Sequence, residues 1–347
     1  MHTTDSSEPI RFITRKWPPA VGGMETYSAK LADELGKRGV VDVIALPGRA
    51  SGAAPTALAL VGFGLNTAVK LLGAREARVV HVADLASWPL AWIAGARHPR
   101  SRIILSAHGS DVTFAQRSGW RAKLYGAYLR LGSAALPRAR VIANSNYIGG
   151  LVRRVGFGRV SVVPLATDMT YAGTAERRHL LYAGRISRPK GLRFLVEEVL
   201  PLLPSAVRLR VAGAVWEESE RPLLSNSRID YLGVLPPQAL ARELARAIAV
   251  LVPTRDFEGF GLVAIEAAAC GAWVIASDHS GLADVAREPV GIAVDAQDAK
   301  VWAAAIDAAL ARTDEQLETD AHAAQAEVER CYRWPRVVDA TLAIYNR

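Results

Sequence analysis

The sequence predicts an α/β protein with two doubly wound parallel sheets, and three observations support this fold class. The chain has 347 residues and is 50% hydrophobic, so it is longer than one average domain and can bury two cores. Its β-branched runs are continuously apolar instead of alternating, which is typical of parallel strands buried on both faces. Helical segments separate these runs and supply the right-handed crossovers that parallel pairing requires.

The predicted strands number six in each half of the chain. In chain order they are IRFIT, VVDVIAL, VVHVA, RIILSA, RVIANS and VSVVP, then LLYAG, LRVAGA, IDYLG, IAVLVPT, WVIASD and GIAVD. Segments such as METYSAKLADELGKRG and KGLRFLVEEVLPLLP are the predicted crossover helices. Small and polar residues at 164–179 mark the join between the halves. We therefore expect domains at residues 1–167 and 168–332, with segment 333–347 packing back on the first domain.

Positive charge is concentrated in the first half of the chain. Residues 1–170 contain 22 Lys and Arg against 10 Asp and Glu, a net charge of +12, whereas the remainder has 20 against 24, or −4. Between Asp111 and Asp168 there are nine cations and no carboxylate. An anionic partner is therefore expected for this half. Nucleic acid is not the expected one, because the sequence has no recognised nucleic-acid-binding module.

The sequence predicts a cytoplasmic protein with no metal ion and no cofactor. The opening MHTTDSSEPI is polar and lacks the order of a secretory signal. The longest apolar run, residues 56–73, is interrupted by Asn66 and Lys70, which makes it a poor membrane span. Cys270 and Cys331 have no metal-ligand spacing, so neither a disulfide nor a metal site is expected.

Polar residues just after strands are candidate ligand groups, because open parallel sheets bind ligands outside the carboxyl ends of their strands. After the run LLYAG the chain continues with Arg185, Lys190 and Gly191 in the stretch GRISRPKG. Two cations followed by a helix N-terminus favour a phosphate or a diphosphate. Taken alone, however, such a pair more often belongs to a solvated surface loop.

The stretch DFEGFGLVAIEAAACG, residues 256–271, contains two glutamates in different surroundings. Its glycines let backbone amides approach a phosphate at the start of a helix. Glu266 follows Glu258 by about two helical turns, in a segment too apolar to be exposed, so its carboxylate needs a partner with paired donors. A ribose diol or a neighbouring arginine would serve. Glu258, on the loop, is placed to accept hydroxyls of a sugar.

A nicotinamide-dependent oxidoreductase is an alternative interpretation of the same stretch. Gly259, Gly261 and Ala264 have the spacing of a dinucleotide-binding fingerprint, and Asp278 closes the next predicted strand. Two features disfavour it. Four residues, RDFE, separate the strand IAVLVPT from the first glycine, whereas that fingerprint turns at once. Glu258 also stands where a pyrophosphate would lie.

The order GRISRPKG then EGFGLVAIE resembles the donor-site signature of retaining glycosyltransferases of family 4, the glycosyl transferases group 1, which have the GT-B fold. Glu258 and Glu266 match that family's E-x7-E motif. The likeness continues through GGME at 22–25, HGSD at 108–111, ANS at 143–145 and the terminal W…Y helix. It implies two Rossmann-like domains facing an interdomain cleft. The N-terminal domain would bind the acceptor, and the C-terminal domain a UDP- or GDP-linked sugar.

The resemblance also implies roles for individual residues. The implied catalytic residues are Glu258, His108, Arg185 and Lys190. The residues implied to bind the nucleotide-sugar are Gly22, Gly23, Arg185, Lys190, Glu258, Gly259, Phe260, Gly261, Leu262 and Glu266. Arg185 and Lys190 would hold the diphosphate and Glu266 the ribose, while His108 would lie near the sugar and leaving group. Transfer would keep the anomeric configuration, and cations with helix termini would replace a metal ion.

One loop departs from the family pattern. In SDHSGLADV, His279 and Ser280 stand where small glycines are frequent. The identity of the donor sugar therefore stays open.

A basic amphipathic helix is predicted within residues 117–138. Trp120, Leu124, Tyr128 and Leu131 fall at helical spacing, with Arg121, Lys123 and Arg130 beside them. Such a helix can lie in a membrane interface, where anionic lipid attracts its cations. The alternative is an apolar stripe packed on the core with a solvated basic face. The residues predicted to contact membrane or acceptor are Trp120, Arg121, Lys123, Tyr128 and Arg130.

Together these features predict hexose transfer from a nucleotide-diphosphate sugar to a lipid-linked or anionic glycan acceptor. Cell-envelope or exopolysaccharide synthesis at the inner face of the plasma membrane is the expected setting. A nucleotide-sugar epimerase of GT-B fold is the alternative with the same architecture. Such an enzyme would convert the donor without any acceptor.

Overall fold

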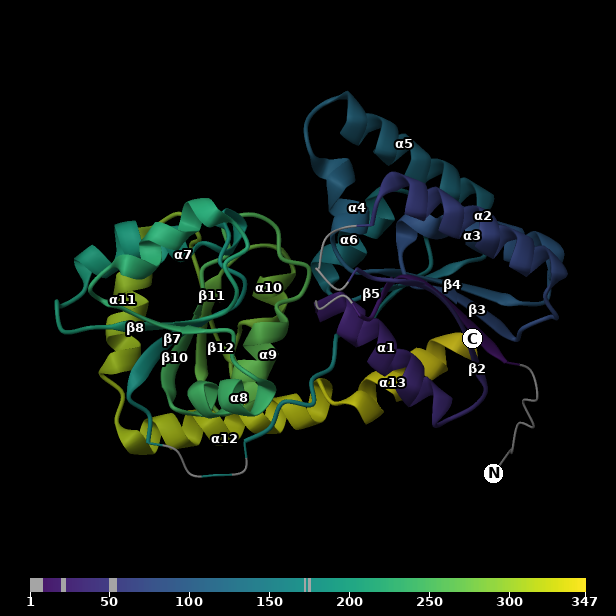
Figure 1. Cartoon of the computed structure of the whole chain (residues 1–347). Coiled ribbons are helices and arrows are strands. Elements are labelled where there is room, and N and C mark those ends of the chain that lie inside the picture. The colour runs from purple at the N-terminus through teal and green to yellow at the C-terminus, as the bar shows by residue number, and fades with distance from the viewer. Residues whose placement is uncertain (1–8, 20–22, 50–54, 172, 174–175) are drawn as a thin grey trace. The chain divides into compact units, whose positions relative to one another are not determined.

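The computed structural model describes residues 9–19, 23–49, 55–171, 173 and 176–347, and the chain divides into two compact units (Figure 1). The first unit comprises Met1–Leu165 together with Trp334–Arg347, and the second comprises Ala166–Arg333. The unit boundaries thus fall at 165/166 and 333/334, where the sequence predicted 167/168 and 332/333.

The first unit is a six-stranded parallel sheet with helices on both faces. Its strands are β1 (Ile10–Trp17), β2 (Val41–Pro47), β3 (Val79–Val82), β4 (Arg102–Ala107), β5 (Arg140–Ala143) and β6 (Val160–Val162). Its helices are α1 (Gly23–Gly36), α2 (Ala57–Gly73), α3 (Trp88–Arg97), α4 (Ser110–Thr113), α5 (Trp120–Ala135), α6 (Asn146–Arg154) and α13 (Trp334–Tyr345). The strand order β2-β1-β3-β4-β5-β6 reverses direction between β1 and β3. Ligands of doubly wound sheets bind at such a switch point, beyond the carboxyl ends of the strands.

The second unit repeats this architecture with a different strand order. Its strands are β7 (His179–Ala183), β8 (Leu209–Ala212), β9 (Ile229–Gly233), β10 (Ala247–Val252), β11 (Trp273–Ser277) and β12 (Gly291–Val294). Its helices are α7 (Leu192–Phe194), α8 (Pro237–Ala245), α9 (Leu262–Ala269), α10 (Ser280–Val285), α11 (Ala299–Leu310) and α12 (Asp314–Cys331). The order β12-β11-β10-β7-β8-β9 places the switch point between β7 and β10. All twelve predicted runs form strands, and the predicted fold class is confirmed.

One predicted crossover helix is not regular. The segment KGLRFLVEEVLPLLP forms only a short α7, which continues as a π turn at Leu195–Val199 and a 3-10 turn at Leu200–Leu202. Leu200 donates its N–H to the carbonyl of Leu195, five residues back. The change of pitch precedes Pro201, which has no N–H to continue the α-helical pattern.

A buried polar cluster fixes α13 to the sheet of the first unit. His81, on β3, is 1% exposed, and its two ring nitrogens contact the Tyr345 hydroxyl at 2.5 Å and Ser106 Oγ at 2.7 Å. Burial lowers the pKa of His81 to about 3, so the imidazole is neutral. A neutral imidazole offers one donor and one acceptor, and these two hydroxyls satisfy both.

Replacing Tyr345 with phenylalanine should therefore destabilise the protein by about 1–3 kcal/mol, because it leaves a buried ring nitrogen of His81 unpaired. Urea unfolding at neutral pH measures this. The matched control is Tyr231→Phe, since Tyr231 is exposed and its hydroxyl donates a hydrogen bond to the carbonyl of Gly213. Equal losses in the two variants would contradict this account of His81.

Candidate functional site

Three loops meet at the switch point of the second unit. They follow the neighbouring strands β7, β10 and β11, whose parallel pairing brings their carboxyl ends to one edge. Arg255, on the loop after β10, donates its backbone N–H to the carbonyl of Pro189 on the loop after β7, at 2.9 Å. Gly281, after β11, donates to the carbonyl of Glu258, also at 2.9 Å. These backbone bonds hold together the loops that carry Lys190 and Glu258.

Lys190 and Glu258 are paired at this edge. The ammonium of Lys190 donates a hydrogen bond to the carboxylate of Glu258, and both side chains are largely buried, at 28% and 19% exposed. The pair retains capacity for a ligand, because an ammonium has three donors and a carboxylate can accept several hydrogen bonds. The loop after β11 supports it, since Ser280 Oγ accepts the backbone N–H of Glu258 at 3.1 Å.

Gly191 sets the position of Lys190. Its φ is +77°, and a Cβ at this residue would lie 1.9 Å from the carbonyl oxygen of Pro253, directly after β10. Only glycine fits such a close approach of two backbones with a left-handed φ. The loop that carries Lys190 is therefore pressed against the loop that carries Glu258.

Helix α9 begins beside the pair. Gly261 precedes its first residue, Leu262, and has a φ of +92°. Phe260 is 3% exposed and packs edge-on against Tyr332, so its side chain anchors the loop and its backbone remains at the helix start. Gly259 is also buried. Unpaired N–H groups at a helix N-terminus favour a negatively charged ligand.

Glu266 lies on α9 and is the second glutamate of the predicted motif. Among the residues that the structure describes, its carboxylate has no hydrogen-bond or ion-pair partner, so the neighbouring arginine that the sequence left open is not found. Burial raises the pKa of this carboxyl to about 7. The same environment raises the pKa of Cys270, one turn further along, to about 12. A half-buried carboxylate without a partner is well prepared to accept hydrogen bonds from a bound ligand.

Arg185 is exposed and packs on an aromatic ring that sequence reasoning missed. Its guanidinium lies 5.1 Å from the ring centroid of Trp216, a distance typical of a cation–π contact. Trp216 follows β8 and donates its backbone N–H to the carbonyl of Ile186. The Tyr182 hydroxyl donates to the carbonyl of Arg185 itself. The signal in the sequence was the position of Trp216 just beyond a strand. Ser280, which supports Glu258, also lies just beyond a strand.

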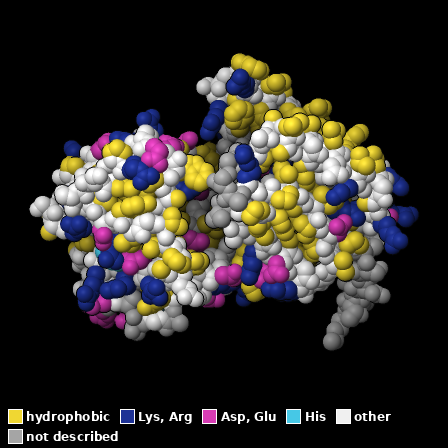
Figure 2. Space-filling model, in the orientation of Figure 1, with side chains coloured by type: hydrophobic (Ala, Val, Ile, Leu, Met, Phe, Trp, Pro, Cys, Tyr) yellow, Lys and Arg dark blue, Asp and Glu magenta, His cyan; other side chains and the backbone are white. Residues whose placement is uncertain are grey.

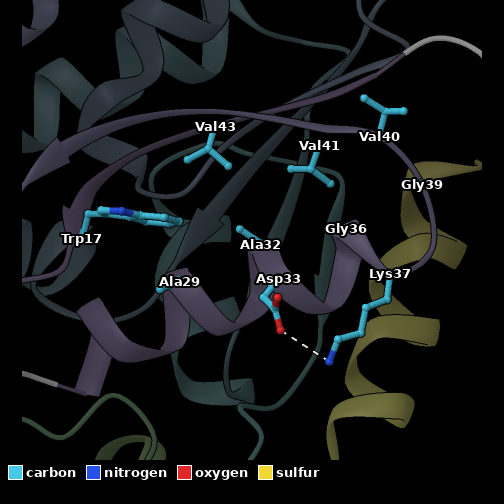
Figure 3. A pocket seen from close by; sticks show the side chains of 10 residues that line it. All are labelled: Trp17, Ala29, Ala32, Asp33, Gly36, Lys37, Gly39, Val40, Val41 and Val43. Carbon is cyan, nitrogen blue, oxygen red and sulfur yellow. Dashed lines mark ion pairs between the residues drawn. The ribbon is translucent and has the colours of Figure 1, made fainter.

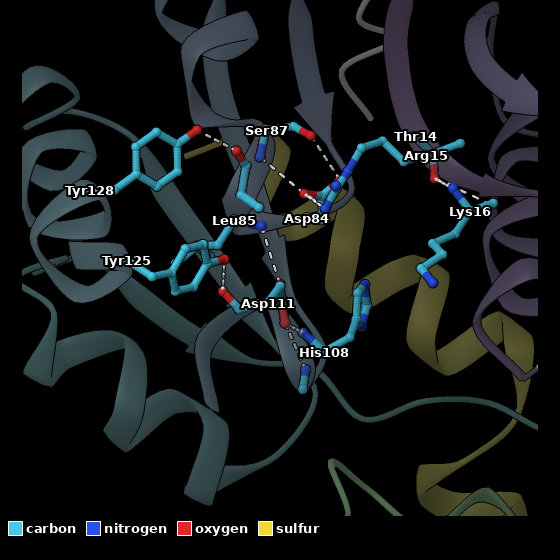
Figure 4. Close-up of polar contacts among 12 residues, drawn as sticks. Thr14, Arg15, Lys16, Asp84, Leu85, Ser87, His108, Asp111, Tyr125 and Tyr128 are labelled. Atoms are coloured by element: carbon cyan, nitrogen blue, oxygen red, sulfur yellow. Dashed lines mark hydrogen bonds and ion pairs between the residues drawn. The ribbon is translucent and has the colours of Figure 1, made fainter. Parts of the chain in front are cut away.

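A polar cluster occupies the switch point of the first unit (Figure 4). Sequence reasoning assigned a catalytic role in it to His108 and quoted Asp111 within the HGSD motif, but it missed Arg15 and Asp84. Arg15, near the end of β1, forms two hydrogen bonds to the carboxylate of Asp84, which follows β3, at 3.0 and 2.7 Å. Asp84 also accepts the N–H and hydroxyl of Ser87. Such a bidentate pair fixes the guanidinium plane. The signal for this pair in the sequence was a charged residue after each of the predicted strands IRFIT and VVHVA.

His108 follows β4 and is held by a neighbouring carboxylate. Asp111 accepts the backbone N–H groups of His108, Gly109 and Leu85. The ring of His108 packs edge-on against Tyr27 of α1, and its Nδ1 is buried without a partner in the described parts of the chain. Burial lowers the pKa of His108, although Asp111 and Asp84 oppose the shift. The imidazole is therefore neutral near pH 7.

The predicted glycine pair is only partly described. Gly22 lies outside the residues that the structure describes. Gly23 begins α1 and is exposed, with Glu25 in the first turn of the helix. The carboxylate of Glu25 lies 3.4 Å from the ammonium of Lys16, at the end of β1.

Helix α5 carries the predicted membrane residues, and one of them faces inward. Trp120, Arg121, Lys123 and Arg130 are exposed. Tyr128 is half-buried instead: its hydroxyl donates to the carbonyl of Ala86 at 2.6 Å, and its ring lies 5.3 Å from that of Trp88. It therefore lies on the inner face of α5, as expected from the alternative in which the apolar stripe packs on the core, and not at a membrane-facing position. Small buried residues on this face allow α5 to pack closely, namely Ala122, Gly126 and Gly132.

Three observations define what else the described residues offer. They include no group of three or more His, Cys, Asp and Glu placed to hold a metal ion. In the same part of the chain, no helix has both the length and the apolarity to cross a membrane. A groove of about 710 Å³ between α1 and the edge strand β2 is mainly apolar (Figure 3). Its charged groups, Asp33 and Lys37, pair with each other at 3.4 Å, so it is poorly equipped for chemistry.

Comparisons with known proteins agree with this arrangement. Residues 177–312 match the family described as glycosyl transferases group 1, and residues 21–171 match glycosyltransferase family 4. A D-inositol 3-phosphate glycosyltransferase from Xylanimonas cellulosilytica is 31% identical over 286 residues, which cover 70% of this chain and 68% of that protein. A GDP-mannose:cellobiosyl-diphosphopolyprenol alpha-mannosyltransferase from Xanthomonas oryzae pv. oryzae is 30% identical over 262 residues, covering 70% and 67%.

The fold agrees as well. The structure of sucrose-phosphate synthase from Thermosynechococcus elongatus superimposes with a TM-score of 0.79 at 22% identity, covering 98% of each chain. Two six-stranded parallel sheets covered by helices are the architecture that the resemblance to GT-B enzymes implied. The chain belongs to the family 4 glycosyltransferases of glycosyl transferases group 1.

Proposed function

We propose that this glycosyltransferase moves a hexose from a nucleoside-diphosphate sugar to an acceptor, with retention at the anomeric carbon and without a metal ion. The observation that carries the proposal is the edge of the second sheet, where Lys190 and Glu258 are paired and Glu266 is half-buried without a partner among the described residues. A nucleoside diphosphate bearing a sugar has a group for each of them. A nicotinamide riboside offers Glu258 no comparable set of sugar hydroxyls to bind.

The donor roles follow from charge. Breaking the bond between sugar and diphosphate builds negative charge on the diphosphate while the anomeric carbon becomes cationic. Lys190, Arg185 and the N-terminus of α9 offset the developing negative charge. Glu258 accepts hydroxyls of the sugar and Glu266 the two hydroxyls of the ribose. In this proposal Trp216 positions the guanidinium of Arg185.

The first unit supplies the acceptor side in this proposal. We propose that His108, as a neutral imidazole, acts on the sugar and leaving group, and that the N-terminus of α1, which begins at Gly23, contributes to binding the phosphates. The cluster of Arg15, Asp84 and Asp111 holds the surrounding loops for the acceptor. The net charge of +12 in residues 1–170 favours an anionic acceptor, such as a lipid-linked phosphate of envelope or exopolysaccharide synthesis. The polyprenol-linked substrate in the name of the Xanthomonas relative is of this class.

A panel of nucleotide-sugars tests the proposed reaction. UDP- and GDP-hexoses are incubated with the full chain, with and without a polyprenyl-phosphate-type acceptor and with EDTA present. We expect a new α-linked product from an α-linked donor, found by NMR of the anomeric proton. Inversion at that carbon, or a requirement for added metal, would remove those parts of the proposal. Conversion of the donor to its epimer without acceptor would instead identify an epimerase.

Donor affinity should depend on the protonation of Glu266. Ribose hydroxyls donate to a carboxylate, and the pKa of this carboxyl is raised to about 7 by burial, so binding must first remove its proton at lower pH. The dissociation constant of a nucleotide-sugar should therefore rise as pH falls below 7, approaching about tenfold for each unit. Calorimetric titration should use the intact nucleotide-sugar, since a terminal phosphate itself titrates near about pH 6.

Glu266→Gln provides the matched control. The amide cannot titrate, so this variant should bind more weakly at high pH and lose the dependence on pH. Glu243→Gln, on α8 of the same unit, should leave the profile unchanged. A wild-type profile that is flat between about pH 5.5 and 8.5 would exclude Glu266 as the ribose ligand.

A further inference from the structure

Helix α2 exposes an apolar face that the proposed reaction does not use. Its residues Leu58, Val61, Leu65, Val69 and Leu72 are 58–82% exposed. Their spacing of three and four places them in one stripe along the helix. Only Thr67 and Leu71 of α2 are buried. An isolated exposed leucine needs no explanation, but a stripe over the full length of a helix indicates a contact surface.

The apolar surface extends from α2 to two further helices. In the first unit α2 packs against α3, and α3 packs against α5 (Figure 1). The exposed apolar side chains on α3 and α5 are Trp92, Trp120, Leu124 and Leu131, each at least 50% exposed. Figure 2 shows hydrophobic side chains gathered over α5 and along α2. We call the outer faces of α2, α3 and α5 the apolar-basic surface.

Charge on these helices selects the occupant. Helices α2, α3 and α5 contain five cations, Lys70, Arg97, Arg121, Lys123 and Arg130, and no Asp or Glu. A second copy of the chain would bring a second set of like charges, which costs free energy at a contact. An anionic lipid bilayer instead accepts apolar side chains below its headgroups and attracts cations beside them. Two tryptophans on the surface suit the same boundary.

We propose that the apolar-basic surface is a membrane-docking surface in which α2 inserts its apolar stripe among the headgroups of an anionic bilayer. Burial of Val61, Leu65 and Val69 drives attachment of the protein to the bilayer, and the cations of α5 add a preference for anionic lipid. This goes beyond the proposed function, and beyond the sequence-based hypothesis that placed only the helix predicted within residues 117–138 at the membrane. In this proposal the apolar segment 56–73 does not cross the membrane; its helix lies in the membrane–water interface.

Helix α5 links the apolar-basic surface to the polar cluster of the first unit. On its inner face, α5 carries Tyr125, whose hydroxyl donates to the carbonyl of Asp111 at 2.7 Å, next to His108. On its outer face it carries Trp120 and Leu124. When its outer face is bound to the membrane, α5 thus has its inner face against the polar cluster proposed to bind the acceptor. A lipid-linked acceptor would have a short path from the bilayer to that cluster.

Vesicle sedimentation of the full chain tests the surface. The probes are phosphatidylcholine vesicles with and without phosphatidylglycerol, in buffer without donor. We expect the wild-type protein to bind mixed vesicles, and V61S/L65S/V69S to bind them at least about tenfold more weakly, because association scales with buried apolar area. R121S/K123S should retain weak binding but lose the preference for anionic vesicles.

The control variant makes the same exchanges, one Leu→Ser and two Val→Ser, at exposed apolar residues of the second unit, L202S/V234S/V301S, and should bind like wild type. Thermal melts verify folding of every variant. Equal vesicle binding by V61S/L65S/V69S and wild type, or no wild-type binding at all, would overturn the proposal. Concentration-dependent dimerisation that V61S/L65S/V69S abolishes would assign the face to a second copy instead. Titration of each variant with a nucleotide-sugar, in the absence of vesicles, measures donor affinity. It therefore distinguishes a failure of the membrane-docking surface from a failure of the proposed donor site.

Discussion

Replacing Lys190 with alanine should lower kcat/KM for glycosyl transfer about a hundredfold to a thousandfold while the protein stays folded. The ammonium is the cation fixed between the loops after β7 and β10, and it is proposed to meet the charge that develops on the leaving diphosphate. Removing one preorganised donor from such a position typically has an effect of this size. The loss should appear mainly in kcat, because the interaction strengthens as the bond breaks.

The ion pair makes a sharper version of this experiment possible. Glu258→Gln keeps the shape of the side chain but removes the charge that Lys190 contacts. If the two groups act as a unit, K190A/E258Q should be little worse than either single variant, whereas independent roles would make the losses multiply. Lys300→Ala, an exposed cation on α11 of the same unit, is the control and should retain wild-type activity. Near-wild-type turnover in K190A and E258Q would exclude this edge as the donor site.

The strand pattern was predictable because burial on both sheet faces leaves a direct trace in composition. Continuous apolar runs such as IAVLVPT can only be covered on both sides, and all of them became parallel strands. The irregular helix after Lys190 was not predicted, since the interruption by Pro201 changes hydrogen bonding without changing the apolar spacing. Strand order was also not readable from the pattern, although it decides where the switch points lie.

Candidate site residues were predictable where a motif lies in one stretch of sequence, and less so where distant loops meet. Glu258 and Glu266 share one segment, so their spacing was visible. Arg15 and Asp84 are 69 residues apart, and only the neighbouring positions of β1 and β3 in the sheet join them. Trp216 meets Arg185 for the same reason. The outward stripe of α2 was hidden because apolar residues at helical spacing usually face a core.

Gly191→Ala should destabilise the second unit by about 2–4 kcal/mol, because the new methyl group collides with a backbone atom. The Cβ would lie 1.9 Å from the carbonyl oxygen of Pro253, and φ at this residue is +77°. No flexible side chain can move aside to relieve such a contact. The loop after β7 must retreat from β10, which takes Lys190 away from Glu258. We therefore expect weaker nucleotide-sugar binding as well as a lower melting temperature.

Gly150→Ala separates this collision from the ordinary effect of adding a methyl group. Gly150 lies in α6 with no atom within 4 Å of a Cβ, so alanine should be neutral there or stabilising by about 0.5–1 kcal/mol. Calorimetric melting of both variants gives the stability difference, and titration of the folded fraction at low temperature gives donor affinity. A variant that melts earlier yet binds like wild type would confine Gly191 to a structural role. If G191A matched wild type in both measurements, the close approach of the two loops would not exist in solution, and the pairing of Lys190 with Glu258 would lose its structural basis.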